Sequence, residues 1–238
     1  MLIRYPSKPS EYIIKQMETV QKIPVGSGGY VEILEVFGDD LTVVNAARVS
    51  FNKESTELGP RDTGLINYLA KHEHISPFFH PQLRFRLKMP IFIAREWFRH
   101  TIGFARNEVS RRYVDTPPEV WIPDNFRERD PNLKQGSRPD SIADKDTAVK
   151  AYIDAMDVSL RTYNTLLELG VAPELARAAL PQSMYTEFIE TGSLAAYARL
   201  CGLRLDPHAQ KEIQEFAAAV SDVCATRFPV SWAALIAV

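Results

Sequence analysis

The chain of 238 residues has few of the features that mark several large protein classes. Its two cysteines, Cys201 and Cys224, are too few and too far apart to predict a disulfide framework or a zinc knuckle. No apolar run approaches the ~20 residues that span a bilayer, and residues 1–12 lack the apolar stretch of a signal peptide. We therefore expect a cytoplasmic protein with buried, reduced thiols and no membrane partner.

The chain also lacks an excess of charge of one sign. Its 28 Lys and Arg residues stand against 30 Asp and Glu residues, for a net charge of −2. This balance gives no overall field that attracts nucleic acid, so an anion site must be a local cluster. His72, His74 and His80 lie close together but fit no closed set of zinc ligands, and we expect no metal site.

The patterning favours one α+β domain over residues 30–238, preceded by a loosely attached arm over residues 1–29. Residues 115–140 are rich in Pro, Asp and Arg and predict a long surface loop. Alternation predicts strands over 30–37 and 82–88 and, less clearly, over 185–191. Helical spacing predicts helices over 41–48, 60–72, 148–169, 173–180 and 207–228, one that starts near Pro90, and one that runs from a Ser193 cap to Cys201.

The most informative segment is RHTIGFARNEVSRRY, residues 99–113, which follows an apolar predicted helix. It contains Arg99, Arg106, Arg111 and Arg112. Guanidiniums so close together repel one another unless an anion lies between them, and the guanidinium is well shaped for bidentate binding of phosphate. We therefore predict a site for a phosphorylated ligand. The alternative is a solvated basic loop with weak surface ion pairs.

This segment resembles the signature of flavin-dependent thymidylate synthases, in which Arg-His-Arg is followed by a short spacer, by Ser, and then by Asn-Glu-x-Ser-x-Arg-Tyr. Thr101 stands in place of the second arginine, and Ala105 stands near the place of the first serine. Blocks over 29–51, 72–80, 176–194 and 203–214 extend the resemblance to roughly residues 30–229. The matching signature positions are Arg99, His100, Asn107, Glu108, Ser110, Arg112 and Tyr113.

The resemblance implies the family's fold, in which an antiparallel sheet packs with helices, and C5 methylation of dUMP to dTMP. It also implies FAD as the cofactor, NADPH and methylenetetrahydrofolate as co-substrates, and a homotetramer with shared active sites. No nucleophile is evident, because neither Cys201 nor Cys224 has a nearby His that would lower its pKa. This absence favours hydride chemistry carried by a cofactor.

For the nucleotide, the resemblance implies that Ser110, Arg111 and Arg112 bind the 5′-phosphate together with Arg177. Arg204 is expected to be the catalytic residue, which contacts the uracil ring and stabilises negative charge at N3 and O4. From the residues alone, a pair between Arg204 and Asp206 at the edge of the core is the alternative. The other substrate-binding residues that the resemblance implies are Glu96, Trp97, Phe98, Arg99, Glu108 and Val109, of which Glu96 is expected to pair with a neighbouring arginine.

For the flavin, the resemblance implies contacts from both halves of the chain. Thr101 and Ala195 lack the charge that many members carry at these positions, and Arg199 is expected to restore some of it. Each lost charge-assisted contact is worth ~1.5–3 kcal/mol, so we expect FAD to bind more weakly or at an altered angle. The implied cofactor-binding residues are Ser50, His74, Ser76, Arg99, His100, Thr101, Glu108, Ser193 and Arg199.

Two other functions stay open. Thr101, Ala105 and Arg106 reshape the signature, which suits a relative that methylates UMP in a specialised nucleoside pathway. The missing second arginine also suits a non-catalytic flavin- or nucleotide-binding relative. Arg177 and Arg204 are both retained, which argues against a decayed site.

Overall fold

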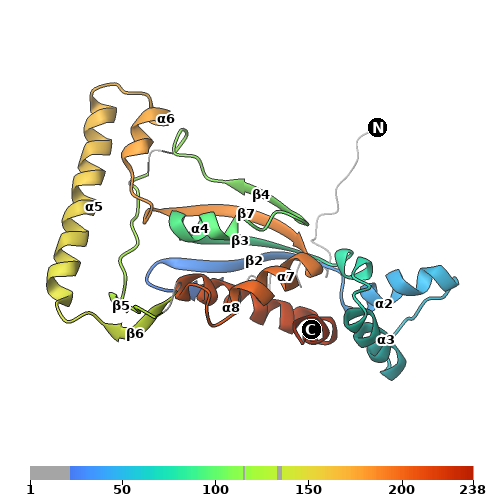
Figure 1. The fold of residues 1–238 in the computed structure, drawn as a ribbon. Coiled ribbons are helices and arrows are strands. Elements are labelled where there is room, and N and C mark those ends of the chain that lie inside the picture. Colours follow the sequence, from blue (N-terminus) through green and yellow to red (C-terminus); the bar gives the residue numbers. More distant parts are fainter. Residues whose placement is uncertain (1–21, 115, 133–135, 238) are drawn as a thin grey trace, which may run out of the picture.

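A computed structural model describes residues 22–114, 116–132 and 136–237. Its centre is an antiparallel sheet with the strand order β1-β2-β3-β7-β4 (Figure 1). The five strands are β1 (Lys22–Val25), β2 (Gly29–Phe37), β3 (Gln82–Pro90), β7 (Tyr185–Ser193) and β4 (Phe104–Glu108). A second, two-stranded sheet pairs β5 (Arg127–Arg129) with β6 (Ser137–Ser141). The predicted α+β class with an antiparallel sheet is confirmed.

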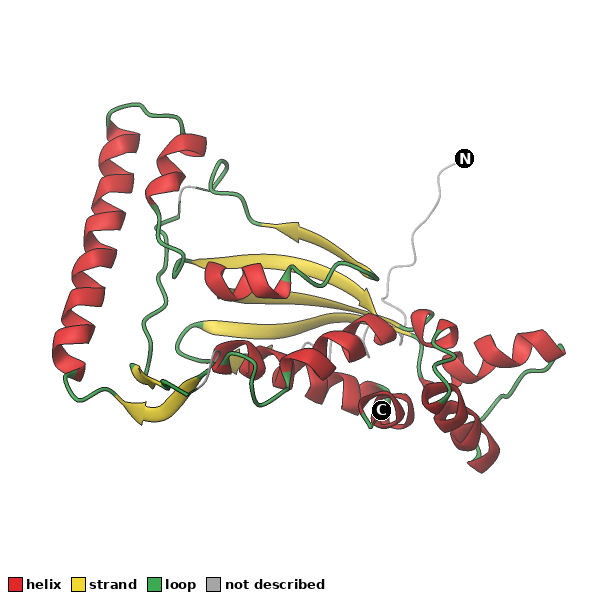
Figure 2. Cartoon of the chain, viewed as in Figure 1, coloured by secondary structure: helices red, strands yellow, loops and turns green. Residues whose placement is uncertain are grey.

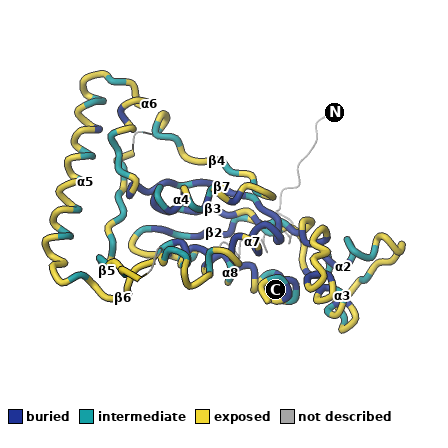
Figure 3. The backbone as a smooth tube through the Cα atoms, in the orientation of Figure 1, coloured by how far each residue is buried: buried dark blue, intermediate teal, exposed yellow. Residues whose placement is uncertain are grey.

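The central strand β3 separates an apolar face from a polar face. Leu83, Phe85 and Leu87 are fully buried on one face, while the arginines between them reach the opposite face. Three helices cover the apolar face: α4 (Ile91–Trp97), α7 (Leu194–Arg204) and α8 (Lys211–Arg227) (Figure 2). The core therefore lies between the sheet and these helices, as the burial colours in Figure 3 show.

The remaining helices lie at the two ends of the sheet (Figure 1). At one end are α2 (Asp40–Arg48), η1 (Val49–Phe51), α3 (Pro60–Lys71), η2 (Ser76–Phe79) and α9 (Pro229–Ile236). At the other end are α5 (Lys145–Glu168), α6 (Pro173–Ala176) and η3 (Arg177–Ala179). None of the helices in the described part of the chain is both long and apolar enough to span a bilayer.

The predicted cap at Ser193 is confirmed, because its hydroxyl accepts from the backbone N–H of Ala196 at 3.2 Å. The helix that follows runs beyond the expected end at Cys201, so that Arg204 is its last residue. Both cysteines are buried and reduced, as predicted. Gly170, with a φ of +82°, follows the end of α5 as the sequence predicts.

Four expectations need correction. Residues 22–25 of the predicted arm form β1 and pair with β2, and residues 1–21 lie outside the described residues. The loop over 115–140 contains β5 and the start of β6. The predicted helix over 207–228 begins only at Lys211, and Pro229 opens the separate helix α9, because proline disfavours a helical conformation in the residue before it. Residues 104–108 of the signature segment, for which the sequence predicted no strand, form β4, because pairing with β7 satisfies their backbone groups.

Candidate active site

Arg204 is held by the end of helix α4, more than 100 residues away in the sequence. Its Nε donates to Nε2 of His100 at 3.0 Å, and its Nη2 donates to the backbone oxygen of Glu96 at 3.3 Å. Its Nη1 lies 3.5 Å from Oε2 of Glu96. The prediction that Glu96 pairs with an arginine is confirmed. The alternative pair with Asp206 is not formed, since that carboxylate instead accepts from the backbone N–H of His208 at 2.7 Å.

His100 is the acceptor in this arrangement and is only 8% exposed. Burial, together with the positive charges of Arg204, Arg106, Arg199 and Arg99, lowers the pKa of His100 to about 4. The imidazole is therefore neutral at pH 7, and its Nε2 keeps the lone pair that accepts from Arg204.

Arg204 lines a cleft of about 830 Å³ that also contains Glu96 and Arg99. Arg127 of β5 and Lys211 at the start of α8 also line this cleft. Such a volume is typical of sites that bind small molecules. Arg127 is fixed, because it pairs with Glu212 at 2.7 Å and donates to the Ser137 hydroxyl at 2.7 Å. No motif or spacing pointed to Arg127, which lay in a predicted loop, whereas Lys211 lay in the block over 203–214.

Arg106 points away from the cleft and into the core. It forms an ion pair with Glu190, a fully buried carboxylate that also accepts from Nε1 of Trp97 at 3.2 Å. Burial raises the pKa of Glu190, and the Arg106 charge opposes that rise. The guanidinium also lies over the rings of Phe98 and Phe104. This pair fastens β4 to the sheet, and the sequence did not identify Glu190.

The turn after β4 lies beside α6 and carries Ser110, Arg111 and Arg112, while Arg177 opens η3 directly after α6 (Figure 1). The backbone N–H and the Nε of Arg112 both approach the Ser110 hydroxyl at 3.4 Å. Arg111 donates to the carbonyl of Thr116, and Arg177 donates to the carbonyl of Glu174 at 3.3 Å. Within the described residues, no carboxylate lies at ion-pair distance from these three arginines. We call Ser110, Arg111, Arg112 and Arg177 the arginine turn.

The cleft and the arginine turn are separate places in one chain. Arg111 lines its own cavity of about 300 Å³, together with Tyr163 of α5 and Pro173 of α6. Arg204 contacts residues of the α4 end and contributes to the cleft described above. Glu108, at the end of β4, accepts from the Thr186 hydroxyl at 2.5 Å.

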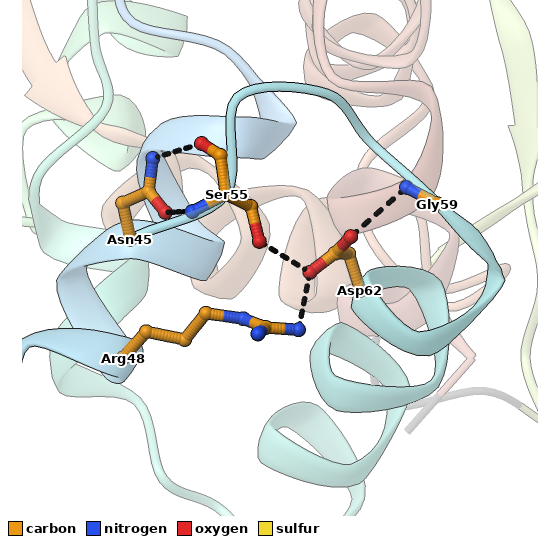
Figure 4. A network of polar contacts seen from close by, with 5 residues as sticks. All are labelled: Asn45, Arg48, Ser55, Gly59 and Asp62. Carbon is orange, nitrogen blue, oxygen red and sulfur yellow. Dashed lines mark hydrogen bonds and ion pairs between the residues drawn. The ribbon is translucent and has the colours of Figure 1, made fainter. Parts of the chain in front are cut away.

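A polar network fixes the loop between α2 and α3 (Figure 4). Asp62 accepts from Arg48 at 2.5 Å, from the Ser55 hydroxyl at 3.0 Å and from the backbone N–H of Gly59 at 2.9 Å. The hydrogen bond from Gly59 is the largest cause of a lowered pKa for Asp62. This network holds the segment that carries Ser50, one of the predicted cofactor-binding residues.

Comparisons with known proteins settle the family. Residues 32–230 match the family described as thymidylate synthase complementing protein. The chain belongs to this family. The resemblance that the signature segment indicated is therefore confirmed.

Relatives and solved structures agree with this assignment. The chain is 40% identical over 215 residues to a flavin-dependent thymidylate synthase of Thermotoga neapolitana, covering 90% of this chain and 94% of the relative. It is 39% identical over 202 residues to that of Thermosipho melanesiensis, covering 84% and 87%. The crystal structure of the UMP/dUMP methylase PolB from Streptomyces cacaoi with 5-Br dUMP has a TM-score of 0.80 at 32% identity, covering 90% and 97%. The same methylase with 5-Br UMP has a TM-score of 0.76 at 32% identity, covering 91% and 97%.

Two residues of the implied site have side chains inside the core of this family member. Trp97 is fully buried against Glu190, and Ser193 is 2% exposed with its hydroxyl engaged in the cap of α7. This placement argues against a direct ligand contact by either side chain. Phe98 is half-buried against Phe188, whereas Val109 is exposed.

Most of the implied flavin-binding side chains are exposed. Arg199 donates to the carbonyl of Ile102 at 2.8 Å and so ties α7 to the turn that carries Thr101. That turn packs closely, because a Cβ on Gly103 would lie 2.9 Å from that of Ala196. Guanidiniums and hydroxyls are donors that suit an anionic diphosphate, so the residues present fit FAD. The exposed members are Ser50, His74, Ser76, Arg99, Thr101, Glu108 and Arg199.

Proposed function

We propose that this protein methylates C5 of dUMP to give dTMP, with FAD as cofactor and NADPH and methylenetetrahydrofolate as co-substrates. One observation carries the proposal: the Arg204 guanidinium is fixed by Glu96 and His100 at the edge of the cleft. An arginine has five N–H donors, and the three contacts leave two for a ligand. A fixed guanidinium beside a pyrimidine stabilises negative charge at N3 and O4 and thereby activates the C5–C6 bond.

The arginine turn would bind the 5′-phosphate. Its three guanidiniums have only carbonyl and hydroxyl partners among the described residues, so their charge is available to an anion. Glu108, which ends the strand before the turn, would contact the sugar.

We further propose that a homotetramer completes the active site. None of the four residues of the arginine turn lines the cleft, and Arg111 lines a different cavity, so one nucleotide would use the cleft of one subunit and the turn of another. Exposed apolar side chains, among them Val49, Phe51 and Tyr113, support burial in an assembly. We place this assembly in the cytoplasm, in keeping with two cysteines that stay reduced.

Arg99, Thr101 and Arg199 would hold the FAD diphosphate, with His74, Ser76 and Ser50 nearer the ring. When bound, FAD supplies the hydride that originates from NADPH, while methylenetetrahydrofolate supplies the carbon. Thr101 contributes a hydroxyl where the family usually has a guanidinium, so this chain would bind FAD more weakly than relatives that keep the arginine.

UMP is the second candidate substrate, because the similar methylase PolB is described as acting on UMP and dUMP and was solved with analogues of both. Arg106 does not support this candidate, since its guanidinium is turned to Glu190. In this chain, the argument for UMP as a substrate therefore depends on the exposed residues Thr101 and Ala105.

The test is an assay of purified, FAD-loaded protein with NADPH, methylenetetrahydrofolate and either dUMP or UMP, with methylated product detected by mass spectrometry. We expect a flavin absorption spectrum and formation of dTMP. Comparable kcat/KM values for UMP and dUMP would favour the second candidate. Absence of methylated product from both nucleotides would refute the proposed function and favour a non-catalytic relative.

A further inference from the structure

His100 is the most deeply enclosed residue of the signature segment. Among residues 99–113 it alone is buried, and its Nε2 is already engaged by Arg204 at 3.0 Å. Its backbone N–H donates to Trp97 at 3.1 Å, so the ring is attached at the very end of α4. A ring held in this way has little surface left for a cofactor, which argues for a different role from the implied flavin contact.

The charges around His100 require a neutral ring. Arg204 contacts it from α7, and the charges of Arg199 on α7, Arg106 on β4 and Arg99 just after α4 also act on it. Glu190 is engaged by Arg106, and Glu96 is engaged by Arg204. An imidazolium would add a fifth positive charge to four guanidiniums and would lose the lone pair at Nε2.

The three contacts to Arg204 use three different nitrogens. Glu96 contacts only Nη1 and Nη2, at one end of the guanidinium. The positive charges of Arg99 and Arg199 repel the guanidinium and do not hold it in place. The acceptor at Nε2 of His100 adds the contact at Nε and so defines the plane of the group.

We propose that His100 is a positioning residue, whose neutral imidazole accepts the Nε–H of Arg204 and fixes the plane in which the remaining N–H groups meet the pyrimidine. This inference rests on the proposed function, in which Arg204 contacts the uracil ring. His100 would thus act on nucleotide binding and activation, through Arg204, and not on flavin binding.

The test compares H100Q with H100L. Glutamine places an acceptor oxygen near the position of Nε2, whereas leucine has similar bulk and no acceptor. We expect H100L to lower kcat/KM for dUMP by about 10- to 100-fold, the loss of one charge-assisted hydrogen bond. The effect should fall mainly on kcat, because the charge at N3 and O4 develops in the transition state. H100Q should recover most of the activity, and H80Q, at an exposed histidine, should match the wild type.

Two further readouts separate positioning from folding and from cofactor binding. Flavin content and melting temperature should be alike in H100Q and H100L, and H100L should add no further loss to R204A. If H100L does not fold, H100N takes its place in the comparison. The asparagine side chain is shorter than that of glutamine, so its amide does not reach Arg204. Calorimetric titration with dUMP should show a smaller difference in the same direction, with H100Q binding more tightly than H100L, because the oriented guanidinium already contacts the bound pyrimidine. This readout remains informative even if the wild type shows no turnover.

Three results would overturn the inference. The first is wild-type turnover and nucleotide affinity in H100L. The second is an equal loss in H100L and H100Q. The third is loss of flavin from both variants, which would identify His100 as a cofactor contact.

Discussion

Arginines near the cleft and arginines in the arginine turn differ in their partners within the chain. Near the cleft, Arg204 and Arg106 each have a carboxylate partner in the chain, Glu96 and Glu190 respectively. In the arginine turn, the described partners are carbonyls and a hydroxyl, and none is a carboxylate. A buried guanidinium destabilises the folded protein unless an opposite charge lies beside it. An exposed guanidinium without a carboxylate partner can instead bind an anion. The comparison separates arginines whose charge is paired within the chain from arginines whose charge is available to an anion.

The largest expected effect is on the buried pair. E190Q keeps an acceptor for Trp97 but leaves Arg106 without its counter-charge, and we expect a loss of about 3–5 kcal/mol in the free energy of unfolding. Urea unfolding measures this loss. The control is E35Q, which breaks the exposed pair with Arg84 and should cost at most about 1 kcal/mol. Equal stability losses in both variants would show that burial does not set the contribution of the pair between Arg106 and Glu190.

The next effect is on turnover. R204A should lower kcat by about 10²–10³-fold, because it removes a fixed donor to the charge that develops on the ring. Flavin content should stay at the wild-type level, as measured by absorbance. R204K should not restore activity, since an ammonium lacks the planar fork. Full activity in R204A would show that ring activation is assigned to the wrong residue.

A smaller effect is expected from the arginine turn. R112A should weaken dUMP binding by about 10- to 100-fold, the value of a charge-assisted contact to phosphate, with kcat at saturation close to wild type. Initial rates over a range of dUMP concentrations separate the two constants. R95A, at an exposed position of α4, is the control. A fall in kcat at unchanged KM would place Arg112 in the chemical step and erase the contrast with Arg204.

The smallest effect concerns acid stability. The pKa of His100 is about 4 in the folded chain and about 6.5 when unfolded. The unfolded state therefore binds more protons between these values, so His100 makes the folded state less stable as the pH falls from 6.5 to 4. H100Q should lose less stability than the wild type between pH 7 and pH 5, as measured by urea unfolding at each pH. Identical pH dependence would show that His100 is not held neutral.

The sequence predicted those parts of the molecule that depend on local rules. Ser193 caps its helix, and β3 alternates between its two faces as its residues indicate. It also predicted that Glu96 pairs with an arginine, but not that the partner is the distant Arg204.

What the sequence missed depends on contacts distant along the chain. The segment over 104–108 looks like a polar turn, and only its pairing with β7 makes it a strand. Glu190 lies in that same partner strand, 84 residues from Arg106, and no local pattern links them. Arg127 reaches the cleft because Glu212 of α8 holds it, which a loop-like composition does not reveal.

The central claim is that the cleft of one subunit and the arginine turn of another form one active site. Its most direct test mixes two variants, R204A and S110A/R112A, after separate purification and exchange of subunits, with dUMP well below its KM. If the two groups come from different subunits, random mixing restores up to about a quarter of the sites, and activity should rise well above either variant alone. Activity that stays at the level of the separate variants, with subunit exchange verified by mass spectrometry, would contradict the claim.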